Sequence, residues 1–419
     1  MVPNLRGLPR QGSDGPQYPT AVRYGSTELQ AGPLGHRKQT TQTPMDRTRW
    51  AAAFVRHYPS QGRLLLPRCY PIKHQPSIGK LFCRGKNPYC NMIIGSRPME
   101  ITYLCPAVNN AVGGIKVIYK HSEMLTKCGI SSSVYHPRNP DFMCTWFDHN
   151  TTIRRNRPLV TGEDFLVIPE MWALFFGDRC LKTNTDYAIF VQNGYLLELG
   201  VPPQQYERLK TIYENARVLM SISTDTTEAI CAAYPKLDRS LIHRLLPHIS
   251  QSFRPAKKEK IISYMPRKLP EHARKMSFFL SEYMRDGWKL VPINNMTESE
   301  TAEVLGRSSI FLSFCDQEGC PLPPLEAALS GALVIGYTGQ GAKEYFCEPN
   351  FWPIENGNFI AFVHAVEQSM RNIENGLLDK ESFRNGISSL RSRYGQETEL
   401  NHLLQFARAT QRLESNSLR

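Results

Sequence analysis

The sequence lacks several features that would each point to a particular class of protein. Its 419 residues contain no run of the roughly 18 apolar residues that a membrane-spanning helix needs. None of its 11 cysteines form a pair at the C-x2-C spacing of zinc sites, and several stand singly in or beside apolar runs. A free cysteine packs there as a small hydrophobic group. We therefore expect a reducing compartment and a cytoplasmic protein.

Acidic residues are almost absent from the first 98 positions, and this decides where the net charge of +12 lies. Residues 1–98 carry 15 Lys and Arg against 3 Asp and Glu, whereas residues 99–419 carry 35 of each. The later part is neutral, so we expect no nucleic-acid binding by the folded body. The early part holds 12 of the 30 prolines and has little to bury, which predicts a disordered basic extension. A false start before Met99, a targeting segment and a polyanion-binding tail stay open as further hypotheses.

The pattern changes at Met99, where short apolar strands begin to alternate with amphipathic helices. A strand at 101–105, a glycine-bearing loop and a helix at 115–127 open this pattern, which is typical of a doubly wound domain. Further strands are expected near 134 and 242 and at 165–169, 187–191 and 217–222, with helices at 203–215 and 225–233.

A polar stretch at 251–259 interrupts the alternation and is predicted to be a hinge. Beyond it, strands are expected at 260–264 and 288–293 and helices at 271–285, 298–307, 357–373 and 379–413. Two such runs predict an α/β fold of two doubly wound, Rossmann-like domains facing a cleft. We place these domains at 99–254 and 255–395, followed by a C-terminal helix and tail at 396–419.

A pair of carboxylates marks the most informative stretch of the second domain. Buried strands are expected at 309–314 and 332–336, joined by a short helix with two prolines at its start and Gly331 at its end. Glu318 lies in the loop after the first strand, and Glu326 is expected in the first turn of the helix. Ligands of parallel sheets bind at this edge, where helix ends attract phosphate and ionised carboxylates bind hydroxyl groups.

This segment resembles the E-x7-E signature of GT-B glycosyltransferases, in particular the retaining, family-four-like group that uses nucleotide-sugar donors. In that family the first Glu lies by the donor sugar and the second holds the ribose hydroxyls. The resemblance makes Glu318 the candidate catalytic residue and assigns donor binding to Glu318, Gly319 and Glu326. The chain departs from the family at Pro321, where glycine is usual and where proline offers no backbone N–H.

Two further pairs of residues are candidates for holding the donor. Arg267 and Lys268 directly follow the first strand of the second domain, and their charge suits a diphosphate. The resembled family places its phosphate-binding Arg and Lys at this strand end. Gly113 and Gly114 follow the first strand of the first domain and allow a ligand to approach the backbone. A glycine-rich turn in that position faces the donor diphosphate and the acceptor in the family.

Polar residues at strand ends are candidates for the acceptor side of the cleft. Glu170 and Gln192 follow two predicted strands of the first domain, in phrases that resemble the acceptor domain of the family; a cap or turn role is the alternative. A glycine-rich turn, 336–341, leads to Glu344 in the second domain. Its default interpretation is a flexible turn, and a contact on the donor side is the alternative.

The absence of any D-x-D pair bears on the chemistry. Sugar transferases of the other major fold hold a metal with such a pair, so we expect no metal, no cofactor, and leaving-group charge met by Arg267, Lys268 and helix ends. His121, His136 and His149 are expected to be structural, and the resemblance implies retention assisted by the departing phosphate.

These observations together predict a function. We expect a glycosyltransferase of polysaccharide biosynthesis that moves a sugar from a nucleotide-sugar donor to a glycan, lipid-linked or small acceptor. The alternatives are a non-catalytic GT-B relative that binds a nucleotide sugar or glycan, and polyanion binding through the N-terminal tail. A peripheral contact with the cytoplasmic membrane face stays open, since it needs only an apolar or basic patch.

Overall fold

The computed structural model describes residues 99–109, 112–137, 139–155 and 164–412. All of them lie in a single unit of the chain. The basic extension predicted for 1–98, with its alternatives of a false start, a targeting segment and a polyanion-binding tail, lies outside the described residues. No helix in the part that is described is both long and apolar enough to cross a membrane.

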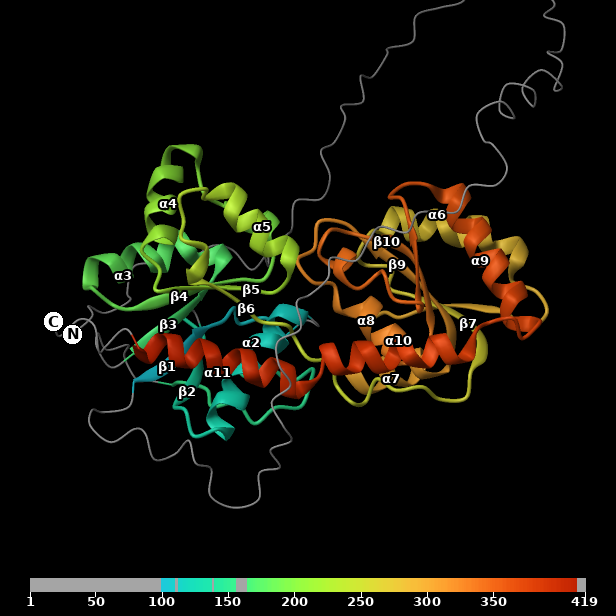
Figure 1. The fold of residues 1–419 in the computed structure, drawn as a ribbon, viewed down its shortest axis with the longest axis horizontal. Coiled ribbons are helices and arrows are strands. Elements are labelled where there is room, and N and C mark those ends of the chain that lie inside the picture. The colour runs from blue at the N-terminus through green and yellow to red at the C-terminus, as the bar shows by residue number, and fades with distance from the viewer. Residues whose placement is uncertain (1–98, 110–111, 138, 156–163, 413–419) are drawn as a thin grey trace, which may run out of the picture. The chain divides into compact units, whose positions relative to one another are not determined.

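The first sheet has six strands that all pair in parallel (Figure 1). Its strands are β1 (Glu100–Leu104), β2 (Ser132–Tyr135), β3 (Asp164–Pro169), β4 (Tyr187–Val191), β5 (Val218–Ser221) and β6 (Ile242–Arg244), in the order β2-β1-β3-β4-β5-β6. We call the part of the chain that builds this sheet and its helices the first domain. The central strands β3 and β4 are largely apolar because helices and loops cover both faces of the sheet.

The helices of the first domain follow the strands as predicted, with one addition. They are α2 (Gly113–Lys127), α3 (Asp178–Thr183), α4 (Tyr206–Glu214) and α5 (Thr224–Ala233). The segment after β3 was not predicted to be helical, but forms a short 3-10 turn and then a π-helix, Ala173–Gly177, which continues into α3. Its aromatic run has no 3.6-residue period, and such short irregular helices leave no clear pattern in a sequence.

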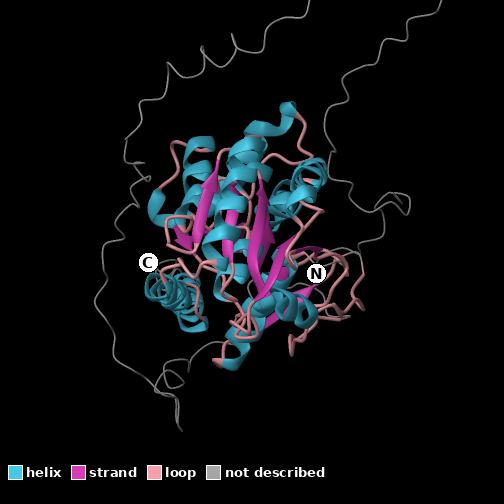
Figure 2. Ribbon diagram, turned by 90° about the vertical axis from the view of Figure 1, so that its right-hand side faces the viewer, coloured by secondary structure: helices cyan, strands magenta, loops and turns pink. Residues whose placement is uncertain are grey.

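The second sheet has five parallel strands in the order β11-β10-β9-β7-β8. They are β7 (Glu259–Tyr264), β8 (Lys289–Pro292), β9 (Ser308–Cys315), β10 (Leu333–Thr338) and β11 (Phe351–Ile354), and the helices are α6 (Pro270–Leu280), α7 (Glu298–Arg307), α8 (Leu322–Leu329), α9 (Phe359–Glu374) and α10 (Lys380–Arg393). Figure 2 shows helices on both sides of the strands. We call this part the second domain; its edge strand β11 was not predicted.

Alternation along the central strands divides each core into two layers. In β3, Phe165 and Val167 belong to one hydrophobic cluster, and Leu166 and Ile168 belong to another. Successive side chains of a strand point to opposite faces, so both faces of the sheet are buried. The second sheet shows the same division, and the predicted doubly wound α/β fold is confirmed.

The last helix, α11 (Gln396–Arg412), returns to the first domain. Leu403 and Phe406 of α11 are fully buried in a cluster with Tyr103 and Phe165 of the first sheet. The sequence predicted a helical stretch over 379–413 and placed the last helix from 396, and the chain breaks the stretch after Arg393 into α10 and α11. The break lets α10 pack on the second domain and α11 on the first, as expected for the last helix.

The link between the domains is held by a lysine. Lys258 donates hydrogen bonds to the carbonyl oxygens of Gly306 (2.8 Å), Ser308 (2.9 Å) and Ser330 (2.6 Å). These carbonyls lie at the C-terminal ends of α7 and α8, where unpaired oxygens and the helix dipole attract a cation. The predicted hinge is therefore anchored to the second domain just before β7 begins.

Candidate active site

The carboxylate motif lies at the end of β9, as predicted, but its helix begins earlier than expected. Helix α8 starts at Leu322 with Pro321 as its N-cap, and no acidic residue lies in its first turn. Glu326 therefore lies in the second turn rather than the first. The prolines after Leu322 are tolerated because the first N–H groups of a helix have no intrahelical partner. We call residues 316–321 the motif loop.

Glu318 of the motif loop pairs with a predicted phosphate ligand. The ammonium of Lys268 lies 2.7 Å from Oε2 of Glu318, and both side chains are partly accessible to solvent. An ion pair of this exposure contributes at most about 1 kcal/mol to stability. The structure thus brings together two residues that are fifty positions apart, in a contact that a charged ligand could replace at little cost.

Glu326 lies among charged groups of both domains. Burial raises its pKa to about 7, while Lys116 and Arg267 lower it and Glu298 raises it. Lys116 is on α2 of the first domain, and its ammonium pairs with Glu298 of α7 at 2.7 Å. A cavity of about 10 Å³ is lined by Glu326, Lys116 and neighbouring residues. Glu326 is therefore half-buried beside α2 and near enough to Arg267 to sense its charge.

Gly113 and Gly319 lie where the domains touch, and Gly114 lies against Gln192 within the first domain. A Cβ on Gly319 would lie 2.1 Å from the carbonyl oxygen of Gln192, and a Cβ on Gly114 would lie 2.4 Å from Oε1 of the same glutamine. The backbone oxygen beside Gly319 leaves no room for any side chain, whereas the Gln192 side chain beside Gly114 would have to move aside. A Cβ on Gly113 would meet Cδ1 of Leu322 in α8 at 3.2 Å, which is tight but faces a flexible side chain.

Helix α2 begins at these glycines without a cap. Its N-cap residue, Val112, has no side-chain hydrogen bond to offer, and its first turn contains no acidic residue. Ile115 and Lys116 donate their N–H groups to the carbonyl of Val112, which leaves those of Gly113 and Gly114 for a ligand, and the helix dipole favours a negative charge there. The glycines place this end beside Gln192 and the start of α8.

Glu170 is hydrogen-bonded to the loop that follows β4. It is buried after β3, and its Oε1 accepts a hydrogen bond from the backbone N–H of Asn193 at 3.1 Å. Burial raises the pKa of Glu170 to about 7, against the opposing effect of backbone N–H groups. Asn193 in turn donates from Nδ2 to the carbonyl of Gln317 in the motif loop, at 2.9 Å. This geometry favours the turn role for Glu170 and brings its neighbours to the domain contact.

Comparison with known structures decides the fold. No family model matches the chain. Sucrose-phosphate synthase from Thermosynechococcus elongatus superposes with a TM-score of 0.57 at 14% identity, over 76% of this chain and all of that one. Anabaena HepE, solved in complex with UDP-glucose, superposes with a TM-score of 0.52 at 10% identity, over 76% of this chain and all of HepE. The fold is GT-B.

A curated relative extends the likeness to sequence. An α-1,6-glucosyltransferase from Actinobacillus pleuropneumoniae serotype 7 (strain AP76) is 26% identical in an alignment of 307 residues that covers 70% of this chain and 89% of the relative. The chain therefore spans nearly the whole of this relative.

His121, His136 and His149 of the first domain each contact a neighbouring polar group. Nε2 of His136 lies 2.7 Å from the hydroxyl of Tyr119, and Nε2 of His149 lies 2.9 Å from the carbonyl oxygen of Cys144. His121 is buried and pairs through Nε2 with Glu399 of α11 at 3.2 Å. These contacts match the structural role expected of all three.

Several residues at the domain contact were missed by the sequence analysis. Lys116 and Glu298 lie in amphipathic helices, where charged residues are usually only solvated, so no local signal distinguished them. Asn193 follows a predicted strand end and could have been named with Gln192. Glu344 was noted only as the residue after a glycine-rich turn, yet it contacts both domains.

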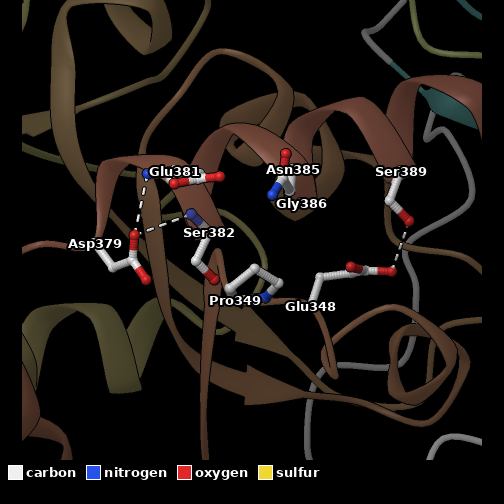
Figure 3. A pocket seen from close by; sticks show the side chains of 8 residues that line it. All are labelled: Glu348, Pro349, Asp379, Glu381, Ser382, Asn385, Gly386 and Ser389. Carbon is white, nitrogen blue, oxygen red and sulfur yellow. Dashed lines mark hydrogen bonds between the residues drawn. The ribbon is translucent and has the colours of Figure 1, made fainter.

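A second cavity of the GT-B second domain has the wrong charge for a nucleotide. It measures about 440 Å³ and lies at the start of α10. Figure 3 shows Glu348, Asp379 and Glu381 around it, with Asp379 accepting hydrogen bonds from the backbone N–H groups of Glu381 and Ser382. Three carboxylates would repel a diphosphate. None of the predicted site residues lines this cavity.

Proposed function

We propose that this chain is a glycosyltransferase that takes a sugar from a nucleotide-sugar donor held between its two domains. The observation that carries the proposal is the convergence of Gly114, Gln192 and Gly319, beside the Glu318–Lys268 pair. The curated relative is named a glucosyltransferase, and HepE was solved with UDP-glucose. UDP-glucose is therefore the first donor to test, with a glycan as acceptor.

The donor diphosphate would be met from both sides. The uncapped end of α2, with Gly113 and Gly114, offers backbone N–H groups from the first domain. Arg267 and Lys268 offer positive charge from the second. Preorganised N–H groups and cations of this kind stabilise the charge that develops on a departing nucleoside diphosphate. This supports a transfer without a metal.

Glu318 has two successive partners in this proposal. Without a donor its carboxylate is held by the ammonium of Lys268 at 2.7 Å. A diphosphate competes for Lys268 and so releases Glu318, which then accepts hydrogen bonds from the hydroxyls of the sugar. Charge-assisted hydrogen bonds of this kind contribute about 1.5–3 kcal/mol each. Donor binding and sugar positioning are coupled through one ion pair.

Glu326 is proposed to hold the ribose hydroxyls, following the E-x7-E pattern. Its ionised form is the stronger acceptor, and the positive charges of Lys116 and Arg267 favour that form. Its place in the second turn of α8, close to α2, puts it where both domains can contribute to the same ligand.

The chemical step is proposed to proceed with retention. The acceptor oxygen forms a bond to the anomeric carbon, the bond from that carbon to the phosphate oxygen breaks, and the acceptor proton passes to the departing phosphate. This route needs no dedicated base, which fits the structural contacts of His121, His136 and His149. A cytoplasmic site of action, and a lipid-linked acceptor at a membrane surface, belong to the same proposal.

A non-catalytic relative that binds nucleotide sugars is the second candidate, and Pro321 favours it. Proline removes a backbone N–H where the family usually has glycine. Pro321 nevertheless fits its place: φ is −68°, and its carbonyl accepts a hydrogen bond from the hydroxyl of Tyr345 at 2.5 Å. The backbone at this position therefore does not require glycine.

The two candidates separate in one experiment. The protein is incubated with a panel of nucleotide sugars headed by UDP-glucose, and release of nucleoside diphosphate and thermal stabilisation are both measured. Release that disappears in Glu326→Ala supports the transferase. Stabilisation without release supports the binding protein, and neither effect with any donor would contradict both.

A further inference from the structure

The glycine-rich turn after β10 packs directly against the motif loop. Backbone N–H of Gly341 donates to the carbonyl oxygen of Glu318 at 3.0 Å. A Cβ on Gly341 would lie 1.8 Å from the carbonyl oxygen of Gly319, so only glycine allows this approach. The motif loop and the turn are therefore in direct contact. A residue that holds the turn in position also holds Glu318 and Gly319 in position.

Glu344, three residues after this turn, reaches the first domain. It ends a short helical turn, Gly341–Glu344, and its side chain is only 10% exposed. Its Oε2 accepts a hydrogen bond from the backbone N–H of Thr224 at 3.0 Å and pairs with Arg244 at 2.5 Å. Thr224 is the first residue of α5, so the carboxylate also lies at the positive end of that helix.

The same carboxylate is anchored in the second domain. Its Oε1 accepts a hydrogen bond from the hydroxyl of Tyr394 at 3.0 Å, and the Glu344 carbonyl accepts one from Arg393 at 2.8 Å. Each oxygen of the carboxylate is therefore bound to a different domain. A group that is this buried and has this many partners is costly to disturb.

We infer that Glu344 is a positioning residue that holds the motif loop at its working distance from the first domain. The inference rests on the proposed function, since it concerns the site of that reaction. Glu344 itself touches no reacting atom; it acts through Gly341 on the loop that carries Glu318. With Glu344 in place, Gly319 lies against Gln192. The donor-binding groups of both domains then face the same nucleotide-sugar molecule.

This role predicts a particular division between binding and turnover. Arg267, Lys268 and Glu326 bind the donor from the second domain alone, so loosening the domain contact leaves most of the donor affinity. Turnover needs the groups of both domains in their correct relative positions. A misplacement of about 1 Å can lower the rate about 100-fold. A merely structural residue would instead lower the amount of folded protein and leave the kinetic constants of the remainder unchanged.

The test compares Glu344→Ala and Glu344→Gln with the control Glu348→Ala. Glu348 lies four residues further on, and its carboxylate accepts a hydrogen bond from Ser389. Amide hydrogen exchange is measured on the unliganded protein for segments 192–195, 223–226 and 316–319, and kcat and KM are measured with UDP-glucose. Glutamine keeps the acceptor for the N–H of Thr224 but loses the ion pair, so its effect should be intermediate.

We expect the alanine variant to exchange faster in all three segments, at the amide of Thr224 above all. Its kcat should fall about 10- to 100-fold while KM for the donor changes less than about threefold, and the control should match wild type. Unchanged exchange at 192–195 and 316–319, or a change confined to KM, would overturn the inference. If the alanine variant does not fold, the glutamine variant decides by the same criteria. Faster exchange in a protein whose wild type transfers no sugar would sustain the positioning role and refute the proposed function.

Discussion

The two domains contribute different kinds of groups to the proposed donor site. The second domain supplies charged side chains, namely Arg267, Lys268, Glu318 and Glu326. The first supplies charged side chains mainly to ion pairs with the second domain, Lys116 with Glu298 and Arg244 with Glu344. At the donor site it supplies mainly backbone: two glycines at an uncapped helix start, and a turn at Gln192 that approaches Gly319 too closely for any side chain. Charge can attract a ligand from a distance, whereas backbone N–H groups act only in close contact. The second domain should thus govern donor affinity, and the first should govern the rate.

Gly319→Ala should have the largest effect, because it separates the two surfaces. The added Cβ would lie 2.1 Å from a backbone oxygen, which cannot move aside as a side chain can. We expect the transfer rate to fall about 100-fold or more, with smaller losses for Gly114→Ala and the smallest for Gly113→Ala. Steady-state kinetics with UDP-glucose checks this order. Equal losses in all three variants would show that the spacing of the surfaces is unimportant.

Lys268→Met tests the charged side of the comparison. Loss of a charge-assisted contact to phosphate should weaken donor binding about 10- to 100-fold, since such contacts contribute about 1.5–3 kcal/mol. Titration calorimetry with UDP measures this directly. Lys275→Met serves as the control, because Lys275 of α6 lies over the ring of Phe359, the first residue of α9. A variant that binds UDP as tightly as wild type would remove Lys268 from the donor site.

Glu326 should give donor binding a pH dependence. Burial raises its pKa to about 7, so its carboxylate is mostly protonated at pH 6 and mostly ionised at pH 8. If the ionised form holds the ribose, the affinity for UDP falls about tenfold from pH 8 to pH 6. Glu326→Gln should bind more weakly at pH 8 and show a flat profile. A wild-type profile as flat as that of the variant would count against this role.

Glu399 should affect stability and leave the chemistry intact. Its carboxylate is buried between His121 and His248, and these partners lower its pKa to about 2 despite burial. A carboxylate with a depressed folded pKa stabilises the fold above its ordinary value near 4.5, and this contribution is lost as the pH falls towards 2. Glu399→Gln should cost on the order of 3 kcal/mol at pH 7.

Denaturant unfolding of both proteins at several pH values measures this contribution. The difference in free energy of unfolding between Glu399→Gln and wild type should shrink as the pH falls from about 4.5 towards 2. The transfer rate of the folded variant should match that of wild type. A difference that grows as the pH falls would contradict the assignment.

The same contrast explains what could be predicted from the sequence. The charged residues of the second domain stand at strand ends in local patterns, so Glu318, Glu326, Arg267 and Lys268 could be named in advance. Glu344 could not be assigned in this way, because its partners Thr224 and Arg244 are a hundred or more residues away. Pairings between distant segments leave no local period. They depend on how the domains pack, which a single sequence does not encode in its spacing.

Helix boundaries were missed for a different reason. The prolines after Leu322 suggested that α8 begins at one of them, but proline is accepted throughout the first turn of a helix, so the start lies before both. The sequence analysis placed a last helix from 396 but gave no break within the helical stretch 379–413, because the polar and apolar residues continue across the break between α10 and α11. Only the change in packing partner, from the second domain to the first, ends the one helix and begins the other.

The central claim is that the chain holds a nucleotide-sugar donor between its two domains. The second domain contributes the charged side chains at the ends of β7 and β9, and the first contributes the glycines at the start of α2. The most direct measurement is the release of nucleoside diphosphate from UDP-glucose and a panel of other nucleotide sugars, by wild type and by Glu318→Gln and Gly319→Ala. The account predicts release with at least one donor, and a rate at least tenfold lower in each variant. Release that is unchanged in both variants, or no release with any donor, would contradict it.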